Sequence, residues 1–155
     1  KMITIPLNLL VAHFIGDFLL QSDWMAINKS KNWLALALHC FVYSMCFFLM
    51  FMFIVFSHPE LAQYAGMFAN QAGVFFLLTF ITHFMTDYVT SKITSKLWFI
   101  DGVKIKDPMN AYRGGAEYYE VAYNNKRHWF FVMIGFDQLI HFGTLAWTYK
   151  LLIGQ

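Results

Sequence analysis

Histidine and aspartate residues recur along this chain at a spacing that would let their side chains act together. They form three pairs whose members are four residues apart, and a further histidine lies between the first two pairs. Residues four apart lie on one face of an α-helix, so each pair would direct both side chains toward the same neighbour. The seven residues of this His/Asp set are His13, Asp17, His39, His83, Asp87, Asp137 and His141.

Each member of the His/Asp set falls in a stretch of apolar sequence. The 155-residue chain is 59% hydrophobic and only 13% charged, whereas soluble domains carry about 25% charged residues. Because about 20 apolar residues suffice to cross a bilayer as a helix, we predict a single all-α, polytopic membrane domain covering residues 1–155. Its four transmembrane helices are expected at residues 3–21, 33–56, 73–91 and 129–150.

The basic residues are distributed unevenly among the links that join these spans. The first and third links hold nine of the eleven Lys and Arg residues, and the second link holds none. Basic links stay on the cytoplasmic side of a membrane, so we expect residues 92–128 to form a cytoplasmic loop and both termini to lie outside. The predicted location is the bacterial inner membrane, in a multi-pass arrangement. With a net charge of only +2, membrane lipids are the expected partners and nucleic acid is not.

The spacing of the His/Asp set also predicts a common depth. Counted from the cytoplasmic ends of their helices at about 1.5 Å per residue, the members of the first pair lie as deep as those of the second. Residues 13–18 also resemble residues 83–88, which indicates two pseudo-symmetric helix pairs related by an axis along the membrane normal. Four helices that share a polar layer would form one site.

This layer would bring three carboxylates together inside the membrane. An Asp at mid-helix costs roughly 2.5–3.5 kcal/mol on insertion, and neighbouring carboxylates repel one another. A divalent ion would remove both costs, and mixed imidazole and carboxylate ligands suit Zn, Fe or Mn. We therefore predict one or two such ions, ligated by the whole His/Asp set, with Asp137 as a bridging ligand or a catalytic general base. Hydrogen-bonded helix packing and a metal-free proton pathway are the alternatives. Residues near the set that could support the ligands or contact a substrate are Gln21, Lys92 and Gln138.

Two longer motifs carry a family resemblance. Residues 13–26, HFIGDFLLQSDWMA, and residues 128–141, HWFFVMIGFDQLIH, resemble those of an uncharacterised family of small bacterial and phage integral membrane proteins, a domain of unknown function. The resemblance implies a membrane protein and brings no activity with it. A looser similarity, in the placement of intramembrane His and Asp, is to membrane-bound metal-dependent hydrolases.

Three functions fit a metal centre at this depth. We predict a metal-dependent hydrolase that acts on a lipid or lipid-linked substrate from the cytoplasmic side, because a metal ion can activate water for attack. One alternative is a transporter of metal ions or protons, although residues 45–52 in the outer half of the second span are apolar. Another is an accessory membrane protein of phage type in which the metal is structural. The sequence alone assigns no oligomeric state.

Overall fold

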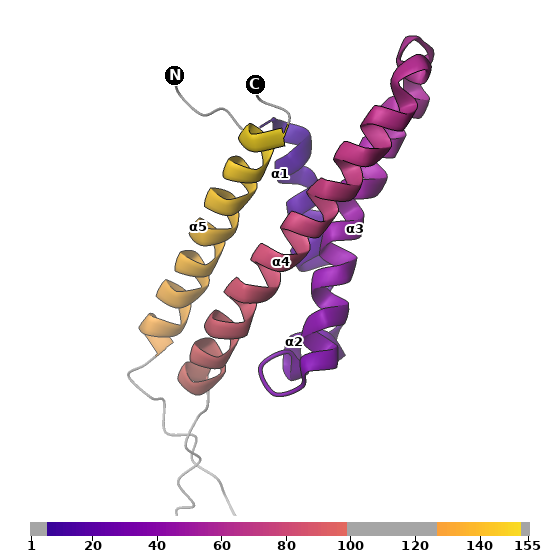
Figure 1. Cartoon of the computed structure of the whole chain (residues 1–155). Coiled ribbons are helices and arrows are strands. Elements are labelled where there is room, and N and C mark those ends of the chain that lie inside the picture. The colour runs from indigo at the N-terminus through magenta and orange to yellow at the C-terminus, as the bar shows by residue number, and fades with distance from the viewer. Residues whose placement is uncertain (1–5, 99–126, 153–155) are drawn as a thin grey trace, which may run out of the picture.

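The structure is a computed structural model that describes residues 6–98 and 127–152, and every element in these residues is a helix. The predicted all-α fold is thus confirmed for this part of the chain. Figure 1 shows an elongated bundle in which consecutive long helices run in opposite directions. The elements in chain order are α1 (Leu7–Phe14), the π-helix η1 (Ile15–Leu19), α2 (Asp23–Asn28), α3 (Trp33–Ser57), the 3-10 helix η2 (Pro59–Tyr64), α4 (Ala65–Trp98) and α5 (Arg127–Leu152).

Short polar side chains set the start of α2 and α3. Ser22 Oγ accepts a hydrogen bond from the backbone N–H of Met25 at 3.3 Å and so caps α2. Asn32 Oδ1 accepts one from the N–H of Leu34 at 2.9 Å and caps α3. Such caps satisfy backbone N–H groups that have no partner within the helix. The helix α1 begins after Pro6, a residue that lacks the N–H needed in a helix interior.

Three described helices, and not the predicted four, are long and apolar enough to cross a membrane. They are α3, α4 and α5. The apolar helix before them covers only Leu7–Leu19, about 20 Å at 1.5 Å per residue, whereas the hydrocarbon core of a bilayer is about 30 Å thick. The predicted span 3–21 is shortened because the helix starts after Pro6 and the chain leaves it at Leu20 to enter α2. Residues 3–5 lie outside the described part of the chain.

Two of the other three predicted spans match a helix of the structure, and the third is shorter than its helix. The predicted spans 33–56 and 129–150 agree with α3 and α5 to within two residues, whereas the predicted span 73–91 is the middle of the longer α4. As predicted, the first link and the two helix ends that border the third link lie at the same end of the bundle, as Figure 1 shows. Of the predicted loop 92–128, residues 92–98 continue α4, and residues 99–126 lie outside the described residues.

The helices pack unequally around a small core. The helix α4 packs along both α3 and α5, and α1 and η1 pack on α3. In contrast, α5 brings no Cα atom within 8 Å of one in α1 or η1. The buried apolar cluster consists of Leu9, Ala12, Tyr43, Phe47, Phe75 and Leu145. Most of the remaining large apolar side chains are exposed, as expected of helices that face lipid.

A glycine allows η1 to lie directly on α3. A Cβ atom on Gly16 would meet the Tyr43 backbone, at 3.0 Å from Cα and 3.2 Å from the carbonyl oxygen, and would lie 3.3 Å from Cys46 Sγ. A side chain there would require the α3 backbone to move by a few tenths of an ångström. The next residue is Asp17, in the middle of the π-helical turn. Such turns frequently occur at functional sites, and here the turn brings Asp17 to the buried side of the bundle.

Candidate metal centre

Five members of the His/Asp set converge in one buried cluster. None of these five is more than 4% exposed, and they come from η1, α3, α4 and α5. Since a buried polar layer inside an apolar bundle requires partners for every member, the contacts among these side chains decide what the layer can bind. The members of this five-residue cluster are Asp17, His39, His83, Asp87 and His141.

The first group of atoms has the spacing of ligands around one ion. Asp17 Oδ1 lies 3.2 Å from His39 Nε2 and 3.5 Å from His83 Nε2, and the two ring nitrogens are 3.0 Å apart. Ligands placed tetrahedrally at about 2.0–2.1 Å from zinc are roughly 3.3 Å from one another. These three atoms could therefore hold a divalent ion with little movement.

A second group shares a histidine with the first. Asp87 Oδ1 lies 3.4 Å from His141 Nε2, and Asp87 Oδ2 lies 3.8 Å from His83 Nε2. The same carboxylate also reaches His39 Nε2 at 3.3 Å, which links the two groups. Within each group the possible ligand atoms all lie within 4.8 Å of one another. The structure thus brings together residues that could hold a metal ion, from opposite ends of the sequence.

Several histidine ring nitrogens of the cluster make no hydrogen bond in the part of the chain that the structure describes. His39 Nε2 faces two carboxylates and a second ring nitrogen, although an imidazole nitrogen carries at most one hydrogen. Nδ1 of His39, Nδ1 of His83 and both nitrogens of His141 make no hydrogen bond within the described residues. Buried polar atoms nearly always have a partner. Of these atoms, His141 Nε2 is the one that also faces a cluster carboxylate, Asp87, at 3.4 Å. A ligated ion would supply its partner, so the donor set fits a divalent metal.

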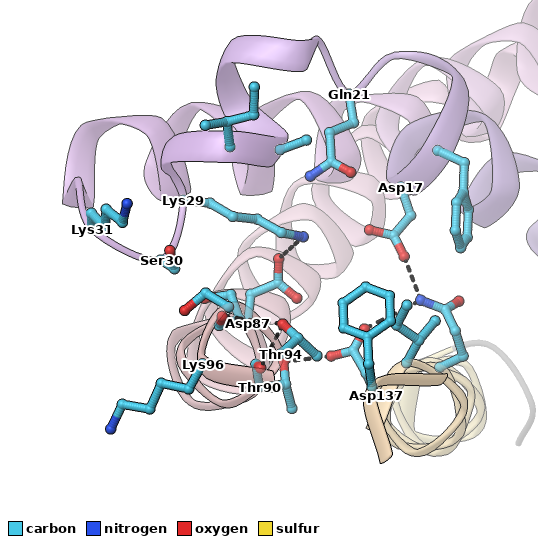
Figure 2. A pocket seen from close by; sticks show the side chains of 18 residues that line it. Asp17, Gln21, Lys29, Ser30, Lys31, Asp87, Thr90, Thr94, Lys96 and Asp137 are labelled. Atoms are coloured by element: carbon cyan, nitrogen blue, oxygen red, sulfur yellow. Dashed lines mark hydrogen bonds and ion pairs between the residues drawn. The ribbon is translucent and has the colours of Figure 1, made fainter. Parts of the chain in front are cut away.

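The sequence-based prediction missed Lys29 as a member of the site. This residue follows α2, and its Nζ lies 2.9 Å from Asp87 Oδ2, as Figure 2 shows. Burial by itself would lower the pKa of Lys29, but the carboxylates of Asp87, Asp17 and Asp137 together outweigh it, Asp87 most of all, and raise the pKa above its usual value. The predicted residue Gln21 lies beside it. With the Gln21 amide oriented to satisfy both neighbours, its oxygen accepts from Lys29 Nζ at 3.1 Å and its nitrogen donates to the Asp17 carbonyl oxygen at 3.2 Å.

His13 lies beside the five-residue cluster and not within its ligand groups. Its Nδ1 is 3.0 Å from Tyr43 Oη and its Nε2 is 2.9 Å from Gln138 Oε1, so both ring nitrogens already have partners. The Gln138 side chain also donates from Nε2 to Asp17 Oδ2 at 2.8 Å. The predicted supporting role of Gln138 therefore has a structural basis. In the structure His13 holds the Gln138 amide that contacts Asp17, and its Nε2 lies 3.8 Å from Asp17 Oδ2; its role as a ligand stays a prediction. Tyr43, four residues after His39 and so on the same helix face, was not predicted.

Asp137 also lies at the edge, with its side chain 15% exposed. Its Oδ1 accepts a hydrogen bond from Thr90 Oγ1 at 2.6 Å, and its Oδ2 is 3.5 Å from His141 Nδ1. It belongs to neither ligand group, and it lines the pocket described below.

The structure does not bring Lys92 to the site. Its Nζ instead lies 3.3 Å from the centre of the Tyr88 ring.

A pocket of about 800 Å³ opens beside the five-residue cluster. Figure 2 shows it between the α2 segment and η1 on one side and α4 and α5 on the other. Asp17 and Asp87 reach it from the cluster, and Lys29 and Asp137 lie against it. The cluster is therefore buried from solvent by its own helices but adjoins a space large enough for a small molecule.

Comparison with known proteins identifies a family. Residues 5–155 match the family model described as "Protein of unknown function (DUF3307)". Comparisons with curated proteins and with solved structures gave no match. The family resemblance predicted from the two long motifs is confirmed by this match over nearly the whole chain, and the looser similarity to metal-dependent hydrolases stays a prediction.

Proposed function

Since the chain belongs to the DUF3307 family, whose description names no activity, we propose its function from the site itself. In this proposal the protein is embedded in the membrane, binds one or two divalent transition metal ions in the five-residue cluster, and hydrolyses a lipid or lipid-linked substrate from the cytoplasmic side. The observation that supports it is the convergence of five buried His and Asp side chains next to a pocket. Zn, Fe and Mn all suit such mixed ligands.

The charges of the site are consistent with a single ion. Lys29 and one divalent ion carry three positive charges, which balance the carboxylates of Asp17, Asp87 and Asp137. A bound ion would lower the pKa of a water molecule and polarise a carbonyl or phosphoryl oxygen. Asp137 is the best-placed general base, because it adjoins the cluster, lies outside both ligand groups and faces the pocket. A base must come within hydrogen-bond reach of the proton that it takes, and the Thr90 contact holds this carboxylate in place.

The proposed orientation places the α2 end of the bundle in the cytoplasm of a bacterium. Lys29, Lys31 and Lys96 all come from segments at this end, in agreement with the rule that basic links stay inside. The start of α1 and the end of α5 would then face outward. A reporter fused after Gln155 should therefore be active outside the cytoplasm, and a cytoplasmic reporter would contradict the proposed orientation.

The predicted pseudo-symmetry keeps some support within this proposal. Asp17 lies 3.2 Å from His39, and the corresponding pair in the second half, Asp87 and His141, is 3.4 Å apart. The two halves would thus bind alike, although α1 and η1 together are much shorter than α4.

The two alternative functions are less well supported by the site. A metal-ion or proton transporter needs a polar route beyond the cluster, but the core next to it contains Leu9, Phe47, Phe75 and Leu145. An accessory protein with a purely structural metal would need neither the adjoining pocket nor Asp137 beside it. Chemistry at the pocket accounts for both features.

The proposal is tested first by the metal content of protein purified without chelators. Elemental analysis should find about one equivalent of a transition metal per chain. Replacing Asp17→Asn and Asp87→Asn together should remove it, whereas Asp23→Asn, the same change in the first turn of α2, should not. Hydrolysis of lipid substrates should then depend on the ion. Wild-type protein that folds and carries no metal would contradict the proposal.

A further inference from the structure

The pocket beside the five-residue cluster has walls of different chemistry. Lys29, Asp87 and Thr90 provide a polar wall, whereas Phe18, Phe130 and Ile134 provide an apolar one. The polar wall adjoins the metal-binding groups, and the apolar wall belongs to η1 and α5. A ligand that matches both walls has a polar group and an apolar chain, as lipids do.

The polar wall favours an anion once a divalent ion is bound. The pocket lining holds the aspartates Asp17, Asp87 and Asp137 and an equal number of lysines, Lys29, Lys31 and Lys96. Lys29 and a bound divalent ion would together balance the three carboxylates, and Lys96 adds a further positive charge to the lining. Figure 2 shows Lys29 directed into the pocket, with Lys31 and Lys96 toward one side of it.

The ammonium group of Lys29 can also donate a hydrogen bond to a ligand. An ammonium group carries three N–H donors. Asp87 Oδ2 takes one at 2.9 Å and the Gln21 oxygen takes a second at 3.1 Å, which leaves the third for a ligand. The side chain is 19% exposed and lines the pocket, into which Figure 2 shows it directed. Lysine is a common partner of phosphate groups, to which it presents a compact positive charge.

The apolar wall leads to a seam between the N-terminal helix and α5. No Cα atom of α1 or η1 lies within 8 Å of one in α5. Side chains bridge these helices. They make the His13–Gln138 and Gln138–Asp17 hydrogen bonds and tilted ring contacts of His13 with Phe142 and His141, at centroid distances of 4.8 and 6.0 Å. Beside the pocket the seam is lined by Phe18, itself 45% exposed, and by Ile134. Apolar side chains at a lipid-facing gap suit an acyl chain.

We infer that this pocket binds a lipid phosphate, with the phosphate group at Lys29 and the metal site and the acyl chain leaving between η1 and α5 past Phe18 and Ile134. The inference rests on the proposed function and names its substrate class. The phosphate is the shared chemistry of a lipid headgroup and of a soluble phosphate ester. The seam favours the lipid, because a soluble ester would leave the apolar wall without a partner.

The experiment compares ligands that differ in one group, using the full chain purified in detergent and loaded with zinc. Phosphatidic acid and diacylglycerol with the same acyl chains differ only in the phosphate. Glycerol 3-phosphate has the phosphate without the chains. We expect phosphatidic acid to bind at least about tenfold tighter than either of the others, since each comparison removes one group of contacts. Metal content is measured in the same samples.

Two variants test the two walls separately. Lys29→Gln should weaken the binding of phosphatidic acid by about tenfold while the metal is retained, because losing a cation does not weaken an ion's hold on carboxylates. Lys150→Gln at the far end of α5 should change nothing. Ile134→Trp should obstruct the seam. It should weaken the binding of phosphatidic acid and leave the binding of glycerol 3-phosphate unchanged. Leu139→Trp, which is 66% exposed on the same helix and does not line the pocket, is the matched control.

The outcomes separate the inference from the proposed function. Equal binding of phosphatidic acid and diacylglycerol in metal-containing protein would overturn phosphate recognition alone. If glycerol 3-phosphate binds as tightly as phosphatidic acid, the proposed path of the acyl chain between η1 and α5 is wrong and a soluble phosphate is the ligand. Wild-type protein without metal would instead show that the proposed function fails, whatever it binds.

Discussion

Lys29 Nζ and Asp87 Oδ2 form an ion pair of 2.9 Å between the segment after α2 and the C-terminal half of α4. The carboxylate belongs to the five-residue cluster and is almost fully buried, while the lysine reaches it from the end of the bundle. The pair therefore combines two functions. It neutralises one of the buried carboxylates, and it places a cation at the boundary between the five-residue cluster and the pocket.

The Lys29–Asp87 pair predicts a stability change that metal reverses. Removing one partner of a buried ion pair leaves an uncompensated charge, at a cost of about 3 kcal/mol. In the presence of a chelator, the Lys29→Gln variant should unfold at a thermal midpoint well below that of the wild-type protein. Added zinc should recover much of the loss, because the ion supplies the missing charge near Asp87. Lys150→Gln removes a lysine charge in the last turn of α5 and should have little effect. An unchanged midpoint for Lys29→Gln in chelator would show that the pair contributes no stability.

His13 and His39 should differ in their effect on metal binding. His39 Nε2 lies among the ligand atoms, whereas both nitrogens of His13 bond to Tyr43 and Gln138. Zinc titration should show that His39→Ala loses stoichiometric binding. His13→Ala should still bind zinc at saturation, with an affinity lowered by about 10- to 100-fold, as is typical for a group that orients a ligand. Complete loss of zinc binding in both variants would show that His13 is a ligand, as the sequence predicts.

Gly16 should be the least replaceable glycine of the described helices. A Cβ there would lie 3.0 Å from the Cα atom of Tyr43, and backbone cannot move aside as a flexible side chain can. Gly16→Ala should cost about 1–3 kcal/mol in stability, by overpacking, and should lower metal occupancy because Asp17 follows it. Gly73→Ala has open space around its Cβ and should be neutral or stabilise α4 by up to about 1 kcal/mol. Thermal unfolding and elemental analysis of both variants measure these effects, and equal behaviour would contradict the close packing of η1 on α3.

Asp137 should be needed for hydrolysis and dispensable for metal binding. In phosphatidic acid hydrolysis, water adds its oxygen to phosphorus, the diacylglycerol oxygen leaves, and the proton taken by Asp137 passes to the leaving oxygen. Asp137→Asn should reduce phosphate release by about 10²–10⁴-fold, the usual contribution of a general base, with metal content unchanged. Asp23→Asn serves as the charge-matched control. Full activity in Asp137→Asn would exclude the proposed role, and loss of metal would make Asp137 a ligand.

Local sequence signals predicted the helical fold and singled out the His and Asp residues that meet in the structure. The pairs at positions 13/17, 83/87 and 137/141 depend only on helical spacing, and the apolar stretches of α3 and α5 depend only on composition. The error at the first span arose because hydropathy does not record where a helix stops. Pro6 and the turn into α2 shorten it. Lys92 was predicted as a residue that could support the ligands or contact a substrate, but its side chain lies on Tyr88.

By itself the sequence determined an all-α chain with apolar helices, a family, and a set of His and Asp residues aligned on helix faces. Only the tertiary structure decided which members of that set meet, that His13 and Asp137 stand beside the ligand groups, and that Lys29 joins them. The physical reason is that spacing along one helix orders side chains on that helix alone. Lys29 and Asp87 are 58 residues apart, and a flexible lysine can point in many directions until the packing of α2, α3 and α4 places a carboxylate within its reach.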